Sequence, residues 1–263
     1  MSVPAIRHYR TPRGVLGKFV ELLWLYEGNV QSHAQERLLP MATTELVIDL
    51  RGSRRASQAT TLAGPHSEHW VLDTAEETAV VGVHFRAGGA FPFFGVPAGE
   101  LHNLRVSLDA LWGPRAESLV DQVLNASSAE AKFDVLERAL LAAASTLARH
   151  RAVAFALQAL SGAPHAPSVA EVTGAIGMSQ RRFLERFRNE VGMAPKLFAR
   201  VQRFQAVVQS VHDRSEVDWA DVAAFCGYFD QAHFIHDFRA FSGFTPTAYL
   251  ALKGEHRNHV PLP

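Results

Sequence analysis

The segment 179–188 carries the side chains of this chain that are best suited to hydrogen bonding with DNA bases. Its sequence is SQRRFLERFR, in which Phe183 and Phe187 stand four positions apart and therefore share one face of a helix. The other face is polar and mostly basic. Arginine can donate two hydrogen bonds to guanine, glutamine can pair with adenine, and glutamate can accept from the amino group of cytosine. This composition favours a helix that lies in a groove of DNA; the alternative is an ordinary surface helix with a solvated charged face.

The chain repeats this framework about fifty positions later. Pairs of matching residues have a constant offset, so one structural unit is used twice, with a one-residue change in the turn after the glycine. Repetition favours the DNA interpretation over that of a single charged helix. The pairs 51 positions apart are Phe183 and Phe234, Phe187 and Phe238, Gly192 and Gly243, and Pro195 and Pro246; those 50 apart are Val169 and Trp219, Val172 and Val222, and Gly177 and Gly227.

Each copy predicts a short helix, a turn with glycine, and a second helix that ends before a proline-initiated third helix. Two short helices joined by such a turn form a helix-turn-helix, whose second helix enters the major groove with its N-terminal residues toward the base edges. Ser168 and Glu171 predict a capping box at the start of the first copy. Two copies would reach successive major grooves, roughly 34 Å apart.

Helical spacing assigns an outward face to the second helix of the first copy. With Phe183 and Phe187 inward, the residues that project away from the core are Gln180, Arg181, Leu184, Glu185 and Arg188. Other basic residues are better placed for phosphates, which supply affinity and salt dependence without sequence information. The predicted phosphate contacts are Arg182, Arg188, Lys196, Arg200 and Arg203.

The motifs resemble the AraC/XylS family of transcriptional regulators. Residues 177–195 read G-M-S-x-R-x-F-x3-F-x4-G-x2-P, and residues 224–249 read A-x-C-G-Y-F-D-Q-A-H-F-x3-F-x4-G-F-T-P-x2-Y. The resemblance covers about 168–250 and implies an all-helical domain of two helix-turn-helix units joined by a long helix from Pro195 to about Val211. It implies base-reading positions at Gln180, Arg181, Leu184 and Glu185, and then at Gln231, Ala232, Ile235 and His236.

Two departures from the family pattern bear on specificity. Glu185 stands where many members have arginine, so the base preference of this position is expected to differ. The second unit has Ala232 and His236 on its groove face and acidic neighbours. We therefore expect the second unit to bind more weakly, or mostly to the DNA backbone.

The composition of the chain bears on which other classes of protein it could belong to. The chain has 263 residues and a formal net charge of zero, but basic residues gather in 179–203 and acidic ones in 213–239. The single cysteine, Cys226, excludes an internal disulfide and a thiolate metal cage, and its apolar helical context predicts a buried side chain. No apolar run reaches the length of a membrane span, and the first residues lack the order of a signal peptide, so we expect no membrane association and a cytoplasmic protein.

The first hundred residues predict strands, at 19–26, 44–50 and 79–85, in an antiparallel barrel or sandwich. Residues 86–95 are rich in glycine and proline and could close one end of it. Helical periodicity follows from about 107 to 161, with a capping box expected at Ser127 and Glu130. We expect a sensor domain over 1–161, a linker at 162–167, the helical DNA-binding domain at 168–254 and a tail at 255–263. The family resemblance implies a cupin-like barrel for the sensor.

A sensor barrel implies an unknown small-molecule effector. Trp24 and His84 could line its pocket, although core packing is the alternative for each. The second hypothesis is a cupin-like metalloenzyme or metal sensor, for which His66, Glu68, His69 and His84 supply ligand types. Paired ligands one residue apart on a strand are missing, so we predict no metal, no cofactor and no enzyme activity. Dimerisation through the helices before the linker stays open, and contact with RNA polymerase is expected only of an activator.

Overall fold

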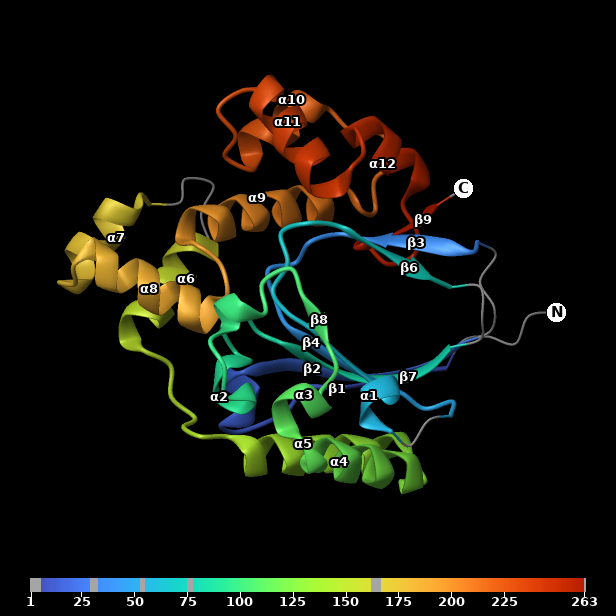
Figure 1. Cartoon of the computed structure of the whole chain (residues 1–263). Helices are drawn as coiled ribbons and strands as arrows, with labels where there is room; N and C mark the ends of the chain where they lie inside the picture. Colours follow the sequence, from blue (N-terminus) through green and yellow to red (C-terminus); the bar gives the residue numbers. More distant parts are fainter. Residues whose placement is uncertain (1–5, 29–32, 53–54, 75–77, 162–166, 263) are drawn as a thin grey trace.

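The computed structural model describes residues 6–28, 33–52, 55–74, 78–161 and 167–262. Figure 1 shows a β-rich half, covered below by two helices, and a helical half that lies above it and to its left. This is the expected order of a β-rich domain followed by a helical one. Residues 162–166 of the predicted linker lie outside the described residues.

Two antiparallel sheets face each other in the β-rich half (Figure 1). The larger has the strand order β1 (Ile6–Arg10), β2 (Val20–Gly28), β7 (Thr78–Phe85), β4 (Glu45–Asp49), β5 (Thr60–Ala63) and β8 (Arg105–Val106). The smaller has the order β6 (Trp70–Asp73), β3 (Gln35–Leu38) and β9 (His259–Leu262). The three predicted strands correspond to β2, β4 and β7.

Buried and partly buried side chains alternate along the strands of the larger sheet. The fully buried face is the outer one, which points away from the smaller sheet. Leu23, Leu46 and Val83 are at most 1% exposed and pack in one core with α4 (Pro114–Asn125) and α5 (Ala129–Ala143). These helices present their own apolar stripes to the sheet, as the sequence periodicity predicted. Most side chains on the inner face of the larger sheet, such as Trp24, Glu45 and His84, are only partly buried. The inner face is therefore the more accessible of the two.

Short elements fill the ends of the β-rich half. They are η1 (Leu16–Lys18), α1 (Ala56–Ala59), α2 (Phe91–Phe94), η2 (Ala98–Glu100) and α3 (Asp109–Trp112). The glycine- and proline-rich segment 86–95 forms α2, at one end of the larger sheet (Figure 1). The expected capping box at Ser127 is wrong by one residue, because Ser128 caps α5 and accepts from the backbone N–H of Ala131.

The helical half has its own core of apolar side chains. Its helices are α6 (Arg151–Ser161), α7 (Val169–Ile176), α8 (Gln180–Val191), α9 (Pro195–Val211), α10 (Trp219–Phe225), α11 (Gln231–Ser242) and α12 (Pro246–Leu252). Helix α9 has the bounds expected of the long connecting helix. Cys226 is buried in this core, as its context predicted.

Helix α6 departs from the expected domain division, which assigned it to the sensor. Val153, Ala156 and Leu157 are buried in the helical core, and α6 packs against α7, α8 and α9. Helical periodicity predicted the apolar stripe of α6 but not the core that it would enter. The two cores therefore divide between α5 and α6, upstream of the expected linker.

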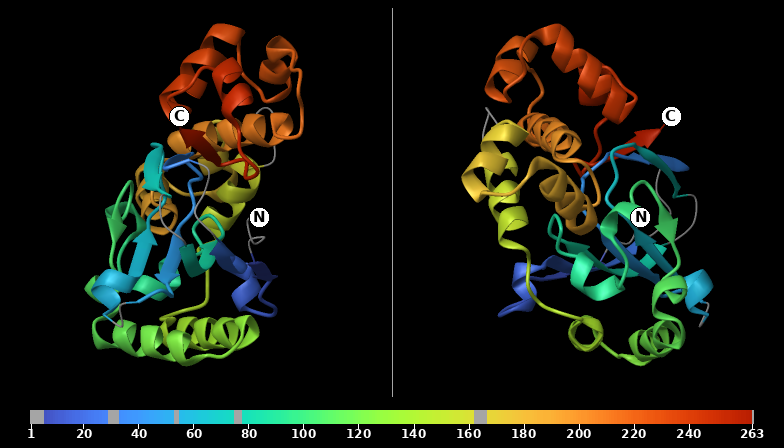
Figure 2. Two further views of the ribbon diagram at one scale, coloured as in Figure 1. Left: turned by 90° about the vertical axis from the view of Figure 1, so that its right-hand side faces the viewer. Right: turned by 60° about the vertical axis from the view of Figure 1, so that its left-hand side comes forward.

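The last strand joins the two halves. The chain leaves α12 and returns to the β-rich half, where β9 pairs antiparallel with β3, so that Val260 lies opposite Arg37. Both views of Figure 2 show this C-terminal strand against the N-terminal half. The side chain of Arg37 on β3 makes two further contacts with the helical half. It donates to the carbonyl of Ser242 at the end of α11 (3.0 Å), and its guanidinium lies over the ring of Phe244. The expected tail is thus an integral strand of the smaller sheet.

Val260 provides a test of this junction. Its side chain is fully buried in the helical core, so Val260→Ala should lower the free energy of unfolding by about 1–3 kcal/mol through lost apolar contact. Val71 on β6 is the matched control, because it is 46% exposed and its replacement by alanine should change stability by less than about 0.5 kcal/mol. Urea denaturation of both variants measures the difference. Equal stabilities would contradict a structural role for β9.

Candidate nucleic-acid interface

Helices α7 and α8 form the first helix-turn-helix unit. The predicted capping box is confirmed: the Ser168 hydroxyl accepts from the backbone N–H of Glu171 (3.2 Å), and the Glu171 carboxylate accepts from that of Ser168 (2.7 Å). Gly177 ends α7 at φ +62°, in the left-handed region that glycine adopts without steric cost. The cap and the glycine together fix where α8 begins relative to α7.

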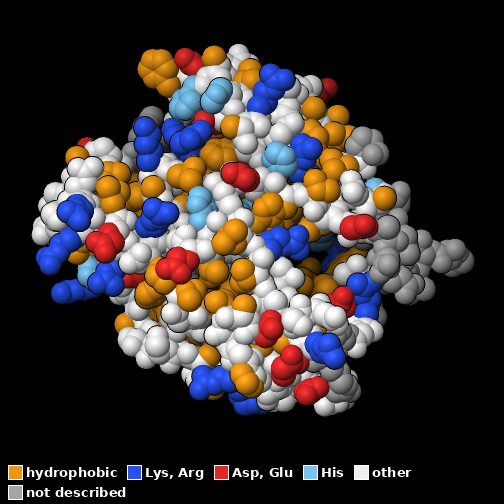
Figure 3. Space-filling model, viewed as in Figure 1, with side chains coloured by type: hydrophobic (Ala, Val, Ile, Leu, Met, Phe, Trp, Pro, Cys, Tyr) orange, Lys and Arg blue, Asp and Glu red, His pale blue; other side chains and the backbone are white. Residues whose placement is uncertain are grey.

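Two phenylalanines set the orientation of α8. Phe183 and Phe187 are fully buried, and Phe187 packs edge-on against Phe198 of α9 with 5.7 Å between the ring centroids. The opposite face is therefore directed to solvent. Its exposed residues include Gln180, Arg181, Arg182 and Glu185, while Leu184 is half-buried at the border of the core. Figure 3 shows Lys and Arg side chains gathered at the left edge of the molecule, over α7 and α8.

Helices α10 and α11 form the second unit on the same plan. Asp230 caps α11 by accepting from the backbone N–H of His233 (2.7 Å), and Phe234 and Phe238 are fully buried. The residues predicted to face the groove are placed as in the first unit, with Gln231, Ala232 and His236 exposed and Ile235 half-buried. Both recognition helices thus present the faces that the sequence predicted.

Helix α9 connects the two units and packs against both. It contacts α8 of the first unit, and α10 and α11 of the second (Figure 1). Phe198 and Phe204 on α9 are fully buried, and Phe204 packs against Phe238 at 5.2 Å between centroids. A shared aromatic core on a single helix therefore holds the two recognition helices in a defined relation.

Arg200, a predicted phosphate contact, has a partner inside the domain. Its guanidinium lies 2.7 Å from the carboxylate of Asp237, which is 2% exposed, and 5.2 Å from the Phe241 ring centroid. The hydrogen bond with Asp237 raises the pKa of Arg200. Asp237 lies on the inner face of α11, so its carboxylate is not one of the acidic groups exposed beside the second groove face.

Arg203 is also engaged internally. It donates to the carbonyl of Gly227 (3.2 Å), in the turn between α10 and α11, and its guanidinium lies 5.3 Å from the Tyr228 ring centroid. Arg200 and Arg203 therefore attach the second unit to α9, and we no longer assign them to phosphates. The other predicted phosphate contacts, Arg182, Arg188 and Lys196, are exposed.

The β-rich half places Trp24 and His84 together, with an acid that the sequence reasoning missed. Trp24 Nε1 donates to Glu45 (3.0 Å), and His84 Nδ1 lies 3.7 Å from the same carboxylate. Burial raises the pKa of Glu45, but interactions with His84 and Trp24 outweigh it and lower the pKa. For His84 burial lowers the pKa, and Glu45 reverses this and raises it. Strand alternation offered a signal, because Leu46 and Ile48 face the outer core and Glu45 must then face inward.

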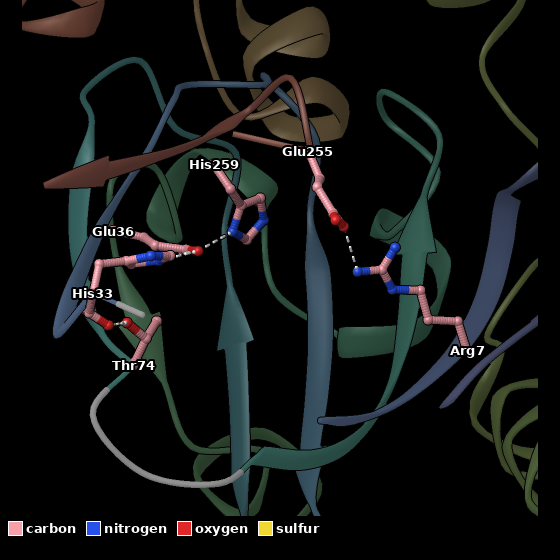
Figure 4. A network of polar contacts seen from close by, with 6 residues as sticks. All are labelled: Arg7, His33, Glu36, Thr74, Glu255 and His259. Carbon is pink, nitrogen blue, oxygen red and sulfur yellow. Dashed lines mark hydrogen bonds and ion pairs between the residues drawn. The ribbon is translucent and has the colours of Figure 1, made fainter. Parts of the chain in front are cut away.

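A second acid, Glu36 on β3, joins the C-terminal strand β9 to the rest of the β-rich half (Figure 4). Its carboxylate lies 2.8 Å from His259 Nδ1 and 2.7 Å from His33 Nε2. Burial raises the pKa of Glu36, but hydrogen bonds from His259 and then His33 outweigh burial and lower the pKa to about 2. Arg7 donates to Glu255 beside this group (2.9 Å). The contact between His259 and Glu36 therefore holds β9 against β3 in addition to the backbone hydrogen bonds.

The histidines considered as metal ligands are dispersed. His66 is buried and stacks on Trp70 at 4.2 Å, and burial lowers its pKa to about 4. His69 Nδ1 lies 3.2 Å from the Phe241 carbonyl of α11, while Glu68 is exposed. Across the described ranges, no group of three or more His, Cys, Asp or Glu side chains is arranged to hold a metal ion. Nor does any helix within those ranges have the length and apolarity needed to cross a membrane.

Comparison with known proteins finds two separate family matches along the chain. Residues 172–251 match a family model described as a helix-turn-helix domain, and residues 8–107 match a domain of unknown function, DUF6597. A curated relative, "Probable transcriptional regulator LumQ" of Photobacterium leiognathi, is 29% identical over 82 residues, which are 31% of this chain and 33% of that protein. This chain thus spans about a third of the length of the curated relative.

Two solved structures are similar to parts or most of this chain. The DNA-binding domain of AdpA in complex with a target DNA is 28% identical, with a TM-score of 0.35, and the match covers 39% of this chain and 92% of that one. ToxT from Vibrio cholerae is 11% identical, with a TM-score of 0.43, over 95% of this chain and 98% of that one.

The chain is a two-domain protein in which a β-rich domain precedes a double helix-turn-helix. Its helical domain matches the helix-turn-helix family model over residues 172–251, and its motifs resemble those of the AraC/XylS family.

Arg200→Ala distinguishes a structural role from a phosphate contact. The substitution leaves the buried carboxylate of Asp237 without its closest cation, so the free energy of unfolding should fall by about 1–3 kcal/mol. The control is Arg239→Ala, at an exposed position of α11, which should change stability by less than about 0.5 kcal/mol. If Arg200→Ala left stability unchanged and weakened the salt dependence of DNA binding, Arg200 would be a phosphate contact.

The lowered pKa of Glu36 predicts a pH-dependent contribution to stability. The carboxylate stabilises the folded state above its unfolded pKa of about 4.5, and this contribution disappears as the pH falls toward 2. The Tm difference between wild type and Glu36→Gln should therefore have its full value above about pH 5 and shrink steadily in more acidic buffers. Glu27→Gln, at an exposed position of β2, is the control. A Tm difference that is constant with pH would contradict the assignment.

Proposed function

We propose that this protein is a sequence-specific DNA-binding regulator of transcription. The observation that carries the proposal is the pair of recognition helices, whose buried phenylalanines direct equivalent polar faces to solvent in both units. Double-stranded DNA is the partner that such faces fit, because the N-terminal part of a recognition helix meets base edges in the major groove.

The first unit supplies most of the base reading. Arg181 is suited to guanine, Gln180 to adenine and Glu185 to the amino group of cytosine, while Leu184 offers an apolar contact. Arg182, Arg188 and Lys196 would contact phosphates and fix the register on the duplex. With Glu185 exposed in a basic surface, its base preference should differ from that of relatives with arginine there.

The second unit has a less polar face. Gln231 and His236 can form hydrogen bonds with DNA, whereas Ala232 and Ile235 can only make apolar contacts. Because Asp237 is buried, it does not add to the negative charge of the surface of this unit. It remains the weaker reader in our proposal, since it lacks an arginine at the four predicted positions.

Control by a small molecule would arise in the sensor domain. The inner face carries Trp24, Glu45 and His84, each of which is only partly buried and can offer polar or aromatic contacts to a ligand. His259 on β9 contacts Glu36 on β3, and β9 follows the helical domain in the chain. A ligand-induced shift of the inner face would therefore reach the helical domain through β9. By linkage, ligand and DNA must change each other's affinity by the same factor.

Other partners follow from the regulatory role. A regulator that acts on the chromosome of a bacterial-type cell would work in the cytoplasm. If it is an activator, it would also contact RNA polymerase. Homodimerisation would use surfaces outside the helical core, because α6 is already packed within it.

DNA binding should weaken steeply as salt rises, because phosphate contacts release counterions. Arg181→Ala should cost about 1–3 kcal/mol on the preferred site and relax specificity at one base pair. Arg115→Ala, at an exposed position of α4 in the β-rich half, is the matched control and should leave binding unchanged. Fluorescence anisotropy on fragments selected from genomic DNA measures both variants. A flat salt response would contradict the proposed function, and an equal loss on every sequence would make Arg181 a phosphate contact.

A further inference from the structure

The last residue of α10 and the turn that follows it expose two phenylalanines. Phe229 is 92% exposed and Phe225 is 74% exposed, and they are the two most exposed large hydrophobic side chains among the described residues. They stand four positions apart. Large apolar side chains exposed to this extent can mark a binding site on a soluble protein.

The fold of the second unit does not require these two rings. The residues between them that do enter the core are Cys226 and Tyr228, at 4% and 6% exposure. The aromatic packing of this unit is made by Trp219 on Phe234 and by Tyr228 on Phe234. The turn thus completes its core with neighbouring residues and leaves Phe225 and Phe229 in solvent.

The first unit has no counterpart of either ring. The position that matches Phe225 is Ala175, and the second turn is one residue longer than the first. After their glycines, Met178 and Tyr228 both pack against the core and correspond to each other. Phe229 is therefore the additional residue, placed between Tyr228 and the N-cap of α11.

This location faces the groove that α11 would enter. Phe229 directly precedes the N-cap residue Asp230, and the first residues of the helix, Gln231 and Ala232, are exposed. In a helix-turn-helix the N-terminal end of the second helix is the part nearest the base edges. Figure 3 shows hydrophobic side chains beside histidines at the top of the molecule, over α10 and α11. Phenylalanine beside a major groove can contact the methyl group of thymine.

We propose that Phe229 makes the second unit select thymine, by apolar contact between the phenyl ring and the methyl group of the base. The inference rests on the proposed function and concerns the second half of the DNA site. It fits the rest of the face, because Ala232 and Ile235 are also apolar. The two units would then read DNA differently, the first by hydrogen bonds and the second largely by shape and methyl contacts.

Single replacement of each thymine by deoxyuridine tests this, since the exchange removes only the methyl group. With the full-length protein, one or two positions in the second half of the site should lose about fourfold in affinity. Phe229→Ala should weaken binding to the thymine site to a similar or larger extent and abolish the sensitivity to deoxyuridine. Phe155→Ala, at a 44% exposed position of α6, is the matched control and should keep both affinity and sensitivity.

The possible results separate the two proposals. Absence of any salt-dependent DNA binding by the wild type would contradict the proposed function itself. Normal binding with undiminished deoxyuridine sensitivity in Phe229→Ala would overturn only the role of this turn. The inference also fails if Phe229→Ala binds DNA normally but loses self-association or stimulation of purified RNA polymerase, because the rings would then serve a protein partner.

Discussion

Burial of four phenylalanines against one helix is the constraint on which the helical domain depends. Phe183, Phe187, Phe234 and Phe238 are all fully buried, and the core that they enter is built on α9. Because residues four apart share a helix face, their burial fixes every outward-facing position of α8 and α11. The same packing that stabilises the domain therefore decides which side chains are available to DNA.

The β-rich domain follows a different principle. Its larger sheet buries the outer face beneath α4 and α5 and leaves partly accessible polar groups on the inner face. Glu45 and Glu36 are held ionised there by imidazoles, and one of those imidazoles, His259, belongs to the last strand. The smaller sheet of this domain thus includes a strand that lies beyond the DNA-binding helices in the sequence, in addition to direct contacts such as that of His69 with the Phe241 carbonyl. This connection gives the proposed effector a physical route to the recognition helices.

Sequence reasoning succeeded where a pattern was local and repeated. The outward face of α8 follows from helical spacing and the capping box of α7 from the pair Ser168 and Glu171, while the bounds of α9 and the outward positions of α11 follow from the family resemblance. The pairing of β9 with β3 joins residues more than two hundred positions apart, and no local pattern specifies it. Arg200 illustrates a second limit, because an arginine has the same chemistry whether its partner is a phosphate or Asp237. The position of Asp237, three residues after Phe234, was the signal that could have identified the inner-face pair.

The central claim is that two unequal recognition helices occupy successive major grooves on one face of a duplex. Protection of guanine N7 from methylation, mapped along a bound fragment, tests this most directly because N7 lies in the major groove. The account predicts two protected patches about 10 base pairs apart, stronger in the half bound by the first unit. A single protected patch, or protection that covers both faces of the duplex uniformly, would contradict it.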